Sequence, residues 1–451
     1  MSRKLFGTDG IRGRSNQYPM VAEVAMALGR ALTSVLKKKY PEPRIVIGKD
    51  TRRSGYMLET ALTSGITSMG GHVFLLGPLP TPAVAYHIRG LRAHGGVMIS
   101  ASHNPYEDNG LKVFNGDGFK LSDEYEAEIE KLILDTKGME QSMPGPESLG
   151  KAERVDDALG RYLVNLKTIF RRDFDLNGMK IVFDGANGAA YDCGVRLFRE
   201  LGAEVVTFAC SPNGFNINKG CAQESAQLLE EKVLEERADI GIAVDGDADR
   251  LMVVDEKGKS LSGEHILFAV AAFLKDSGRL VSNGIVTTSM ANQALEVALH
   301  SQQINCHRAE VGDRYVTAML KEKECIFGGE TSGHYIFMDQ NTTADGLFSA
   351  LEVLALLKSR KWKASQLHQS FSLFPQKLIS VPVRERRPID QMPRLQQAIL
   401  EMENDYQGLG RVNVRYSGTQ MLLRLMVEGP DLKKIEKDLD ALQTLVKSEI
   451  G

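Results

Sequence analysis

The sequence of 451 residues predicts an α/β protein in which three related αβ domains with mixed, mostly parallel sheets precede a smaller α+β C-terminal domain. Short apolar runs alternate with amphipathic stretches in three successive rounds, and this alternation is typical of βαβ units in a mostly parallel sheet. The rounds resemble one architecture used three times, although their sequences are too dissimilar to form a repeat by identity. The final part differs, because several strands precede one amphipathic helix, which indicates an α+β domain.

The elements of the first round follow from helical spacing and from short apolar runs. Leu28, Leu32 and Val35 recur on one helical face, so they predict a helix. Apolar runs bounded by polar residues predict buried strands. The first round is predicted to contain a helix, a strand, a helix and two strands, at residues 25–38, 44–48, 58–69, 73–76 and 96–100.

The pattern then restarts twice before it changes. The second round is predicted to contain strand, helix, strand, helix and strand, at residues 180–184, 188–201, 204–208, 228–236 and 240–244. The third runs from a strand to a helix, at residues 284–288 and 347–359. The last part is predicted to contain three strands and a helix, at residues 377–383, 411–415, 421–427 and 432–448.

Breaks in this pattern predict the domain boundaries. Residues 137–150 are polar and rich in proline and glycine, residues 256–259 have the composition of a turn, and residues 370–376 form a third break. The predicted domains therefore span residues 1–150, 151–256, 257–370 and 371–451.

Charge and cysteine content narrow the class of protein. With 55 Lys and Arg against 58 Asp and Glu, the net charge of -3 argues against a general nucleic-acid binder, which usually carries a basic excess. The five cysteines are scattered without CxxC spacing, as is typical of reduced thiols in the cytoplasm. The N-terminal segment lacks the apolar core of a secretory signal, and no apolar run reaches the ~18 residues of a membrane span. We therefore expect a cytoplasmic protein with no membrane or nucleic-acid partner.

Ser102 is the first candidate for chemistry. It lies in the segment ISASHNP directly after a predicted strand, and His103 follows it. The carboxyl ends of strands are where α/β sheets bind ligands. Taken alone, the segment is explained equally well as an ordinary polar turn. The assignment of Ser102 therefore depends on residues elsewhere in the chain.

Three aspartates follow another predicted strand at alternate positions. Asp245, Asp247 and Asp249 lie in the segment DGDADR, which ends on Arg250. Two carboxylates about 4 Å apart repel by about 4 kcal/mol at an effective dielectric constant of about 20, so three of them need a counter-ion. A hard divalent cation supplies it, and Mg²⁺ suits a site that also handles phosphate. An EF-hand is excluded, because the segment lacks its glycine and distal glutamate.

Two later segments combine polar side chains with glycines. In GGETSGH, Glu330 and Ser332 offer hydrogen bonds to sugar hydroxyls, and His334 titrates near neutral pH, where it can act as a general acid or base. In RYSGT, an arginine precedes hydroxyl groups and a glycine that permits close approach of the backbone. A charged hairpin turn is the alternative to a phosphate-binding loop here. The predicted loop comprises Arg415, Ser417, Gly418, Thr419 and Arg424.

Two weaker segments complete an ordered set, namely FGTDGIRG, which contains Arg12, and NGLK, which contains Lys112. The ordered set FGTDGIRG, SASHNP, NGLK, DGDADR, GETSGH and RYSGT resembles the α-D-phosphohexomutase superfamily over essentially the whole chain. The FGTDGIRG start is similar to that of the bacterial phosphoglucosamine mutase branch. The phosphomannomutase and phosphoglucomutase branch usually opens on a tyrosine-containing variant.

The resemblance implies four domains around a central cleft, with the C-terminal domain binding the substrate phosphate. It implies an isomerase that interconverts glucosamine 6-phosphate and glucosamine 1-phosphate, as a step toward UDP-N-acetylglucosamine and peptidoglycan. Ser102 would be a phosphoserine, and one Mg²⁺ would be bound by it together with Asp245, Asp247 and Asp249. Glucosamine 1,6-bisphosphate is the implied intermediate and activator. A homodimer is usual in the family.

The resemblance also implies roles for single residues. The implied catalytic set beside Ser102 comprises Arg12, Lys112, Arg250 and His334. The implied substrate-binding set comprises His103, Glu330, Ser332, Arg415, Ser417, Gly418, Thr419 and Arg424. Two departures from the family pattern are Gln420-Met421 in the phosphate loop and the residues that follow Cys221. Because the bisphosphate must turn over, the last domain is expected to move.

Three other functions are weighed against this one. A phosphomannomutase or phosphoglucomutase would share every segment. A non-catalytic sugar-phosphate sensor would not need three aspartates beside a serine. A phosphatase that uses a transient phosphoserine would let water compete with the sugar.

Overall fold

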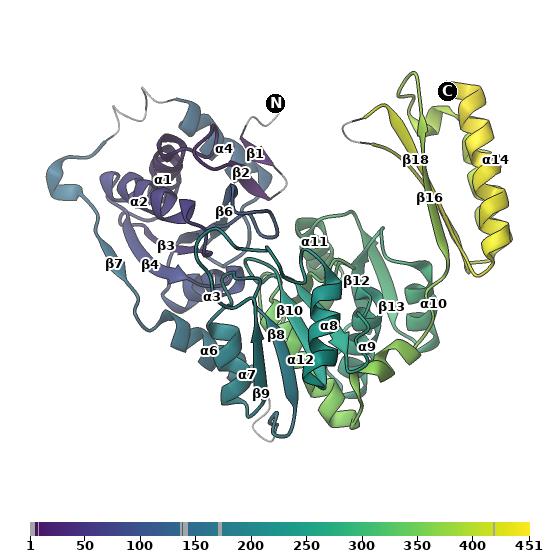
Figure 1. The fold of residues 1–451 in the computed structure, drawn as a ribbon. Coiled ribbons are helices and arrows are strands. Elements are labelled where there is room, and N and C mark those ends of the chain that lie inside the picture. The colour runs from purple at the N-terminus through teal and green to yellow at the C-terminus, as the bar shows by residue number, and fades with distance from the viewer. Residues whose placement is uncertain (1–4, 8, 136–137, 139–142, 170–173, 418–419) are drawn as a thin grey trace.

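The computed structural model describes residues 5–7, 9–135, 138, 143–169, 174–417 and 420–451. Its described strands form four sheets (Figure 1). Three of them belong to αβ domains that pack around a common centre, and the fourth belongs to a smaller α+β domain at the C-terminus. The fold class predicted from the sequence is confirmed.

The first domain contains a seven-stranded sheet in the order β1-β2-β6-β5-β3-β4-β7. Its strands are β1 (Phe6–Gly7), β2 (Gly10–Arg14), β3 (Arg44–Lys49), β4 (His72–Pro78), β5 (Gly95–Ile99), β6 (Asp108–Asn115) and β7 (Ala152–Arg154). Its helices are α1 (Ala22–Lys37), α2 (Ser54–Ser68), α3 (Thr81–Gly90), α4 (Asp123–Leu134) and the short η1 (Pro146–Ser148). Since β7 pairs with β4, this sheet continues past residue 150, where we placed the first boundary. Residues 137 and 139–142 of the predicted linker lie outside the described residues.

The second domain contains a sheet in the order β11-β10-β8-β9. Its elements are α6 (Ala158–Ile169), β8 (Lys180–Asp184), α7 (Cys193–Glu200), β9 (Glu204–Phe208), α8 (Ala226–Glu236), β10 (Ile240–Val244) and β11 (Leu251–Asp255). The helix predicted at residues 188–201 is wrong at its start. Residues 186–192 form turns instead, beginning with the left-handed Ala186 and Asn187, and Gly188 packs against the loop after β10, where a Cβ would lie 2.3 Å from the carbonyl oxygen of Gly246.

The third domain contains a sheet in the order β13-β12-β14-β15. Its elements are α9 (Gly263–Asp276), β12 (Gly284–Thr288), α10 (Gln293–Ser301), β13 (Asn305–Ala309), α11 (Asp313–Glu322), β14 (Phe327–Gly329), β15 (Tyr335–Phe337), α12 (Gly346–Arg360) and η2 (Ala364–Gln369).

One strand order recurs in the first three domains. The first domain contains the order β4-β3-β5-β6, the second β9-β8-β10-β11 and the third β13-β12-β14-β15. When these four strands of each domain are numbered along the chain, the order in the sheet is 2-1-3-4. In each, the first three strands are parallel and the fourth is antiparallel to the third. The connection from the third strand to the fourth is therefore equivalent in the three domains. These three connections contain Ser102, the three aspartates, and the segment from Glu330 to His334.

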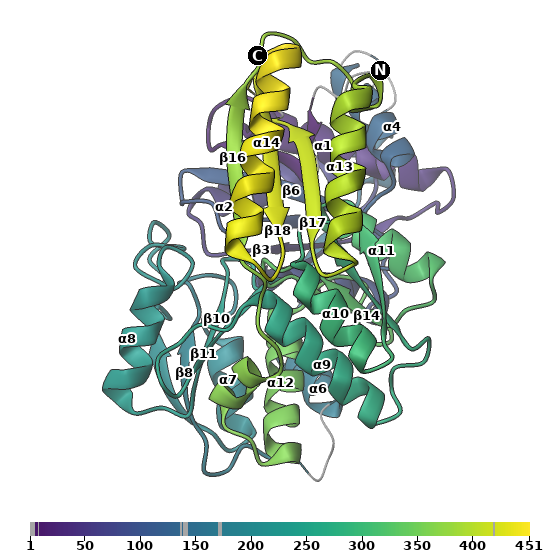
Figure 2. The same ribbon diagram turned by 90° about the vertical axis from the view of Figure 1, so that its right-hand side faces the viewer.

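The C-terminal domain is an antiparallel sheet in the order β16-β18-β17. Its elements are β16 (Gln376–Pro382), η3 (Ile389–Gln391), α13 (Pro393–Tyr406), β17 (Arg411–Tyr416), β18 (Leu422–Glu428) and α14 (Leu432–Ile450). The helices α13 and α14 lie side by side over one face of this sheet (Figure 2). The other face turns toward the first domain (Figure 1).

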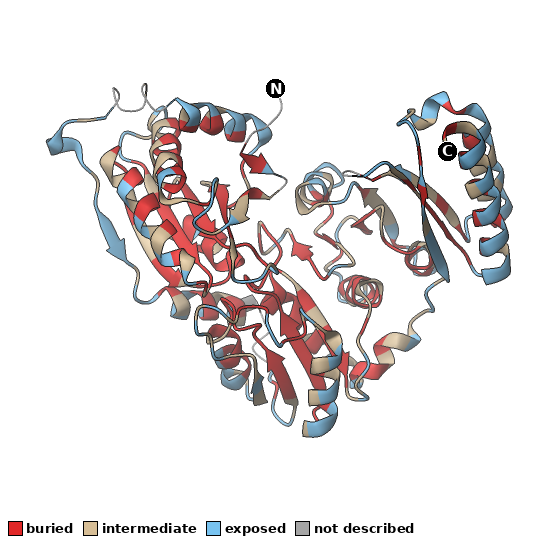
Figure 3. Cartoon of the chain, turned by 45° about the horizontal axis from the view of Figure 1, so that its top comes forward, coloured by how far each residue is buried: buried red, intermediate tan, exposed pale blue. Residues whose placement is uncertain are grey.

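One cluster of buried apolar residues extends across the first three domains, and Val46, Phe183 and Ile285 each come from a different one. Figure 3 shows that buried residues make up most of the central strands of these domains. The C-terminal domain has a separate core. Its links to the third domain include polar contacts, such as the hydrogen bond of 3.0 Å from the Gln293 backbone N–H to Glu428 Oε1 and that of 2.6 Å from Arg411 Nη1 to the carbonyl oxygen of Ser289. Within the described chain, no helix combines the length and apolar character needed to cross a membrane.

Candidate active site

The three equivalent connections meet at a cavity of about 740 Å³. This volume is within the range of sites that hold small molecules. Its wall comes from the first three domains, and none of its lining residues comes from the described C-terminal domain. The polar lining residues include Asp9, Arg12, Ser102, His103, Lys120, Asp249, Arg250, Asp313, Glu330, Ser332 and His334.

Ser102 lies at the edge of the first domain, facing the second. Its side-chain hydroxyl donates to Asp245 Oδ2 at 2.5 Å and lies 3.3 Å from His103 Nδ1. The backbone of Ser102 is left-handed, with φ of 52°, a conformation that non-glycine residues rarely adopt unless their surroundings fix it. The residue is only 2% exposed. The structure therefore holds a single hydroxyl group against the first aspartate of the acidic segment.

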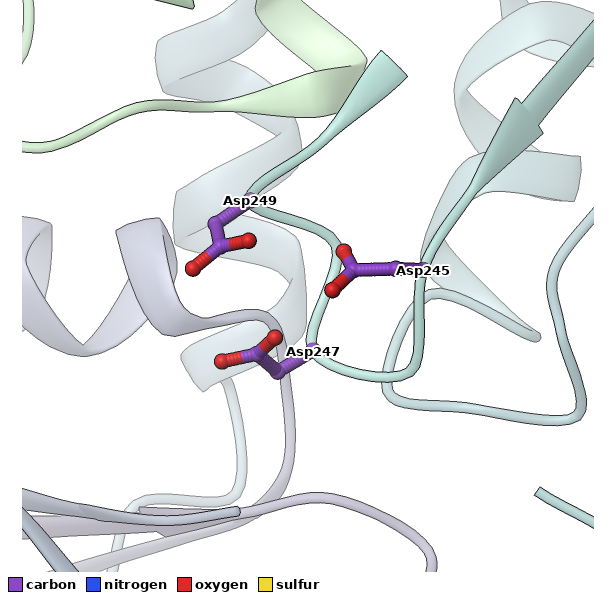
Figure 4. A group of neighbouring side chains, drawn as sticks. All are labelled: Asp245, Asp247 and Asp249. Carbon is purple, nitrogen blue, oxygen red and sulfur yellow. The ribbon is translucent and has the colours of Figure 1, made fainter. Parts of the chain in front are cut away.

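The three aspartates converge from the loop between β10 and β11, and their carboxylates point into one space (Figure 4). One oxygen from each lies within 4.8 Å of the others, and all three residues are buried. Asp247 Oδ1 and Asp249 Oδ1 are buried without a hydrogen-bond partner among the described residues. Buried carboxylate oxygens without partners are what a hard divalent cation requires, so this donor set fits a metal ion.

The protonation of the aspartates depends on their neighbours. Burial, then the charges of Asp249 and Asp247, raise the pKa of Asp245 to about 8. Burial opposes ionisation of Asp249 too, but Lys112 holds the pKa of that carboxyl well below its usual range. Lys112 Nζ lies 2.7 Å from Asp247 Oδ2 and 3.3 Å from Asp249 Oδ2. Burial would lower the pKa of Lys112, but these carboxylates and Asp9 raise it well above its usual value, so the lysine is a fixed cation.

The surroundings shift the pKa values of the two cavity histidines in opposite directions. Burial, with Arg250 and Arg12 nearby, lowers the pKa of His103 and favours the neutral ring. Burial would also lower the pKa of His334, but Asp249 and Asp313 raise it, which favours the imidazolium. His334 Nε2 lies 3.7 Å from Asp249 Oδ2 and 4.0 Å from Asp313 Oδ2. His334 is therefore suited to donate a proton or stabilise charge, and His103 to accept a proton.

The charged residues of the cavity wall that the sequence analysis missed include Asp9, Lys120 and Asp313. Asp9 forms ion pairs with Arg12, Lys112 and Lys120, and Lys120 also pairs with Asp313. These pairs join the first domain to the third beside His334. Asp9 lies in the glycine-rich segment that was already singled out, so its position was a usable signal. Lys120 and Asp313 are far apart in sequence, and no spacing marks them.

The described residues of the predicted phosphate loop do not line the cavity. Arg415 and Arg424 lie opposite each other on β17 and β18, which places two positive charges on one face of the sheet. Ser417 is buried, and its carbonyl oxygen accepts a hydrogen bond of 2.7 Å from Arg386 Nη2. Gly418 and Thr419 lie outside the described residues. The structure thus brings the predicted arginines together but leaves them apart from the Ser102 site.

Family models match this chain in four successive parts. The models for alpha/beta/alpha domains I, II and III of phosphoglucomutase/phosphomannomutase match residues 3–139, 160–258 and 262–374, and the model for the C-terminal domain matches residues 378–442. The chain belongs to the phosphoglucomutase/phosphomannomutase family.

Relatives in this family are similar over nearly the whole chain. The phosphoglucosamine mutase of Syntrophus aciditrophicus is 48% identical, covering 99% of this chain and 100% of its own. That of Syntrophobacter fumaroxidans is 47% identical, covering 99% of each chain.

Solved structures agree in fold. A phosphoglucomutase/phosphomannomutase family protein of Burkholderia thailandensis has a TM-score of 0.81 at 23% identity, covering 99% of this chain and 98% of its own. N-acetylphosphoglucosamine mutase of Aspergillus fumigatus, solved with GlcNAc-6P and magnesium, has a TM-score of 0.68 at 18% identity, covering 99% and 96%.

The two departures from the family pattern have different surroundings. In the segment at residues 214–223, Cys221 is buried and its thiol donates to the carbonyl oxygen of Asn218 at 3.0 Å. Gln420 is exposed, and its carbonyl oxygen accepts from Arg386 Nη2 at 3.0 Å. Arg386 therefore donates to the carbonyl oxygens of Ser417 and Gln420, on both sides of the predicted phosphate loop, a contact that the sequence did not reveal.

Proposed function

We propose that this protein interconverts glucosamine 6-phosphate and glucosamine 1-phosphate, the reaction predicted from the sequence. The name of its relatives and their 47–48% identity over nearly the whole chain support this substrate. The observation that carries the chemistry is the hydrogen bond of 2.5 Å between Ser102 Oγ and Asp245, at a cavity walled by three domains. An intramolecular phosphotransferase needs a group that stores the phosphate while the sugar turns, and we assign that role to Ser102.

The reaction would proceed from a phosphorylated Ser102. The bond from phosphorus to Ser102 Oγ breaks as a new bond forms to a sugar hydroxyl oxygen, which gives glucosamine 1,6-bisphosphate. The proton of that hydroxyl must leave. His103 lies 3.3 Å from Ser102 Oγ and its lowered pKa favours the neutral ring, so it would accept this proton. After the bisphosphate turns over, the other phosphate returns to Ser102 Oγ and the proton returns to the sugar oxygen.

Positive charge must offset the phosphoryl oxygens during transfer. Arg12, Arg250 and His334 line the cavity, and Lys112 lies buried beside the aspartates, so these four would stabilise the transition state. Asp245, Asp247 and Asp249 would hold one Mg²⁺, which would supply further charge stabilisation when bound. Glu330 and Ser332 would contact sugar hydroxyls.

A cytoplasmic location is supported by the five free cysteines.

Substrate preference is the direct test of this function. We expect kcat/KM for glucosamine 6-phosphate to exceed that for mannose 6-phosphate and glucose 6-phosphate by at least about 10²-fold, because a site built to hydrogen-bond one polar group of its substrate rejects analogues that lack it. The measurement is a mutase assay primed with the matching 1,6-bisphosphate for each sugar. A clear preference for mannose or glucose 6-phosphate would instead favour a phosphomannomutase or phosphoglucomutase.

Substitution of the C-terminal arginines tests whether the predicted phosphate loop binds the substrate phosphate. Replacing Arg415 or Arg424 with glutamine removes a charge-assisted hydrogen bond, which contributes about 1.5–3 kcal/mol, so KM should rise about 10- to 100-fold. The matched control is Arg394→Gln, because Arg394 lies on α13, over the covered face of the same sheet. An unchanged KM in both variants would contradict the assignment of this loop to the substrate phosphate.

A further inference from the structure

The backbone of the Ser102 loop is held by a side chain of the second domain. Asn218 Nδ2 donates to the carbonyl oxygens of Ser102 and Asn104, at 2.9 and 2.8 Å. Arg52, from the first domain, donates to the same two oxygens. Asn218 is buried and is itself left-handed, with φ of 61°. The unusual backbone of Ser102 is therefore fixed partly from outside its own domain.

The aspartate loop belongs to the second domain, and it is held by a residue of the first domain. Thr81, the first residue of α3, donates its backbone N–H to the carbonyl oxygen of Asp247 at 2.9 Å and its hydroxyl to Asp247 Oδ2 at 2.5 Å. Thr81 is fully buried. Its hydroxyl therefore orients one carboxylate of the set that fits a metal ion.

The two loops also touch directly. A Cβ on Gly246 would lie 2.5 Å from the carbonyl oxygen of Ser102, so only glycine permits this approach. The loops belong to different sheets, and no strand pairing aligns one with the other. Their relative position must therefore be set by contacts across this boundary.

We propose that Thr81 and Asn218 are positioning residues that form a reciprocal clasp, in which each of the first two domains holds the reactive loop of the other. The clasp fixes Ser102 Oγ relative to Asp245, Asp247 and Asp249. This inference rests on the proposed function for its kinetic consequence, because phosphoryl transfer depends on alignment to within about 1 Å. Neither side chain lines the cavity, so the clasp acts on turnover rather than on sugar binding.

The Asn218 half is tested with Asn218→Ala and with the shape-matched Asn218→Asp, which replaces the donor by an acceptor. We expect kcat to fall about 10- to 100-fold with KM within about twofold of wild type, since a misplaced reacting group slows the chemical step. Amide hydrogen exchange at residues 100–105 should accelerate in both variants. The exposed neighbour Lys219 provides the control, Lys219→Ala, which should change neither quantity.

The Thr81 half is tested with Thr81→Val, which keeps the shape and removes the hydroxyl, against Thr81→Ser, which keeps the hydroxyl. Groups that orient metal ligands commonly affect metal affinity about 10- to 100-fold, so Thr81→Val should weaken Mg²⁺ binding by that factor and Thr81→Ser should restore it. The measurement is calorimetric titration with Mg²⁺ alone.

The outcomes separate the clasp from the proposed function. If Thr81→Val binds Mg²⁺ like wild type and residues 100–105 exchange as in wild type in both Asn218 variants, the clasp is wrong, whatever the enzyme turns over. A lower melting temperature with kcat intact at a permissive temperature would also overturn it, because that result marks a purely structural role. If wild type lacks mutase activity, the proposed function fails, while metal affinity and exchange still decide the clasp.

Discussion

Replacing Ser102 with alanine is expected to abolish mutase activity, lowering kcat by at least about four orders of magnitude, the scale seen when a covalent nucleophile is removed. No phosphate can be stored on an alanine, so neither half of the reaction can start. The fold should survive, because Asp245 and His103 are the hydrogen-bond partners that the Ser102 hydroxyl has among the described residues, and the backbone hydrogen bonds of residue 102 remain.

Three measurements accompany this variant. The bisphosphate-primed assay should show turnover in wild type only, and mass spectrometry should find phosphate on the peptide of Ser102 in wild type only. The control is Ser122→Ala, because Ser122 is exposed on the same domain and caps α4 without a side-chain hydrogen bond.

Undiminished biological activity of Ser102→Ala would favour the non-catalytic sensor. Release of inorganic phosphate by wild type, rather than the isomeric sugar phosphate, would favour the phosphatase.

Local sequence patterns predicted the elements that carry the chemistry. The apolar strand β10 and the acidic loop after it could both be predicted from the sequence, because burial of a strand and repulsion among neighbouring carboxylates are local properties. The three rounds were also readable as one architecture. Their shared strand order shows why Ser102, the aspartates and Glu330 occupy equivalent connections, and why three separate segments meet at one cavity.

Contacts between domains were not readable from the sequence. Thr81 lies in no segment that the sequence singles out, and Asn218 lies in a segment noted only for the residues after Cys221. The atoms that Asn218 and Thr81 hold lie 114 and 166 positions away in the chain. No periodicity or spacing marks such a pair. The same is true of Lys120 and Asp313, whose ion pair joins the first domain to the third. Burial of a charge can be understood only when its partner is known.

Removing divalent cations is the second large effect that we expect. Treatment with a chelator should lower kcat/KM by at least about 10³-fold, because a bound cation contributes several kcal/mol of charge stabilisation, and added Mg²⁺ should restore it. Replacing Asp247 with asparagine should have a similar effect, since Asp247 contributes a buried oxygen without a hydrogen-bond partner among the described residues. The exposed Asp156→Asn is the control. Full activity after chelation would contradict the metal assignment.

The affinity for Mg²⁺ should also depend on pH, and the raised pKa of Asp245 determines the direction of this dependence. Its pKa is raised to about 8, chiefly by burial and then by Asp249 and Asp247, so the metal-free site holds a proton at lower pH. Mg²⁺ must displace that proton, so its affinity should rise about tenfold per pH unit up to about pH 8 and then level off. Titrations across this range should show the slope in wild type and lose it in Asp245→Asn, which has no carboxyl group to titrate. A flat profile in wild type would mean that Asp245 is already ionised at neutral pH, and that Arg250 and the hydrogen bond from Ser102 outweigh its burial.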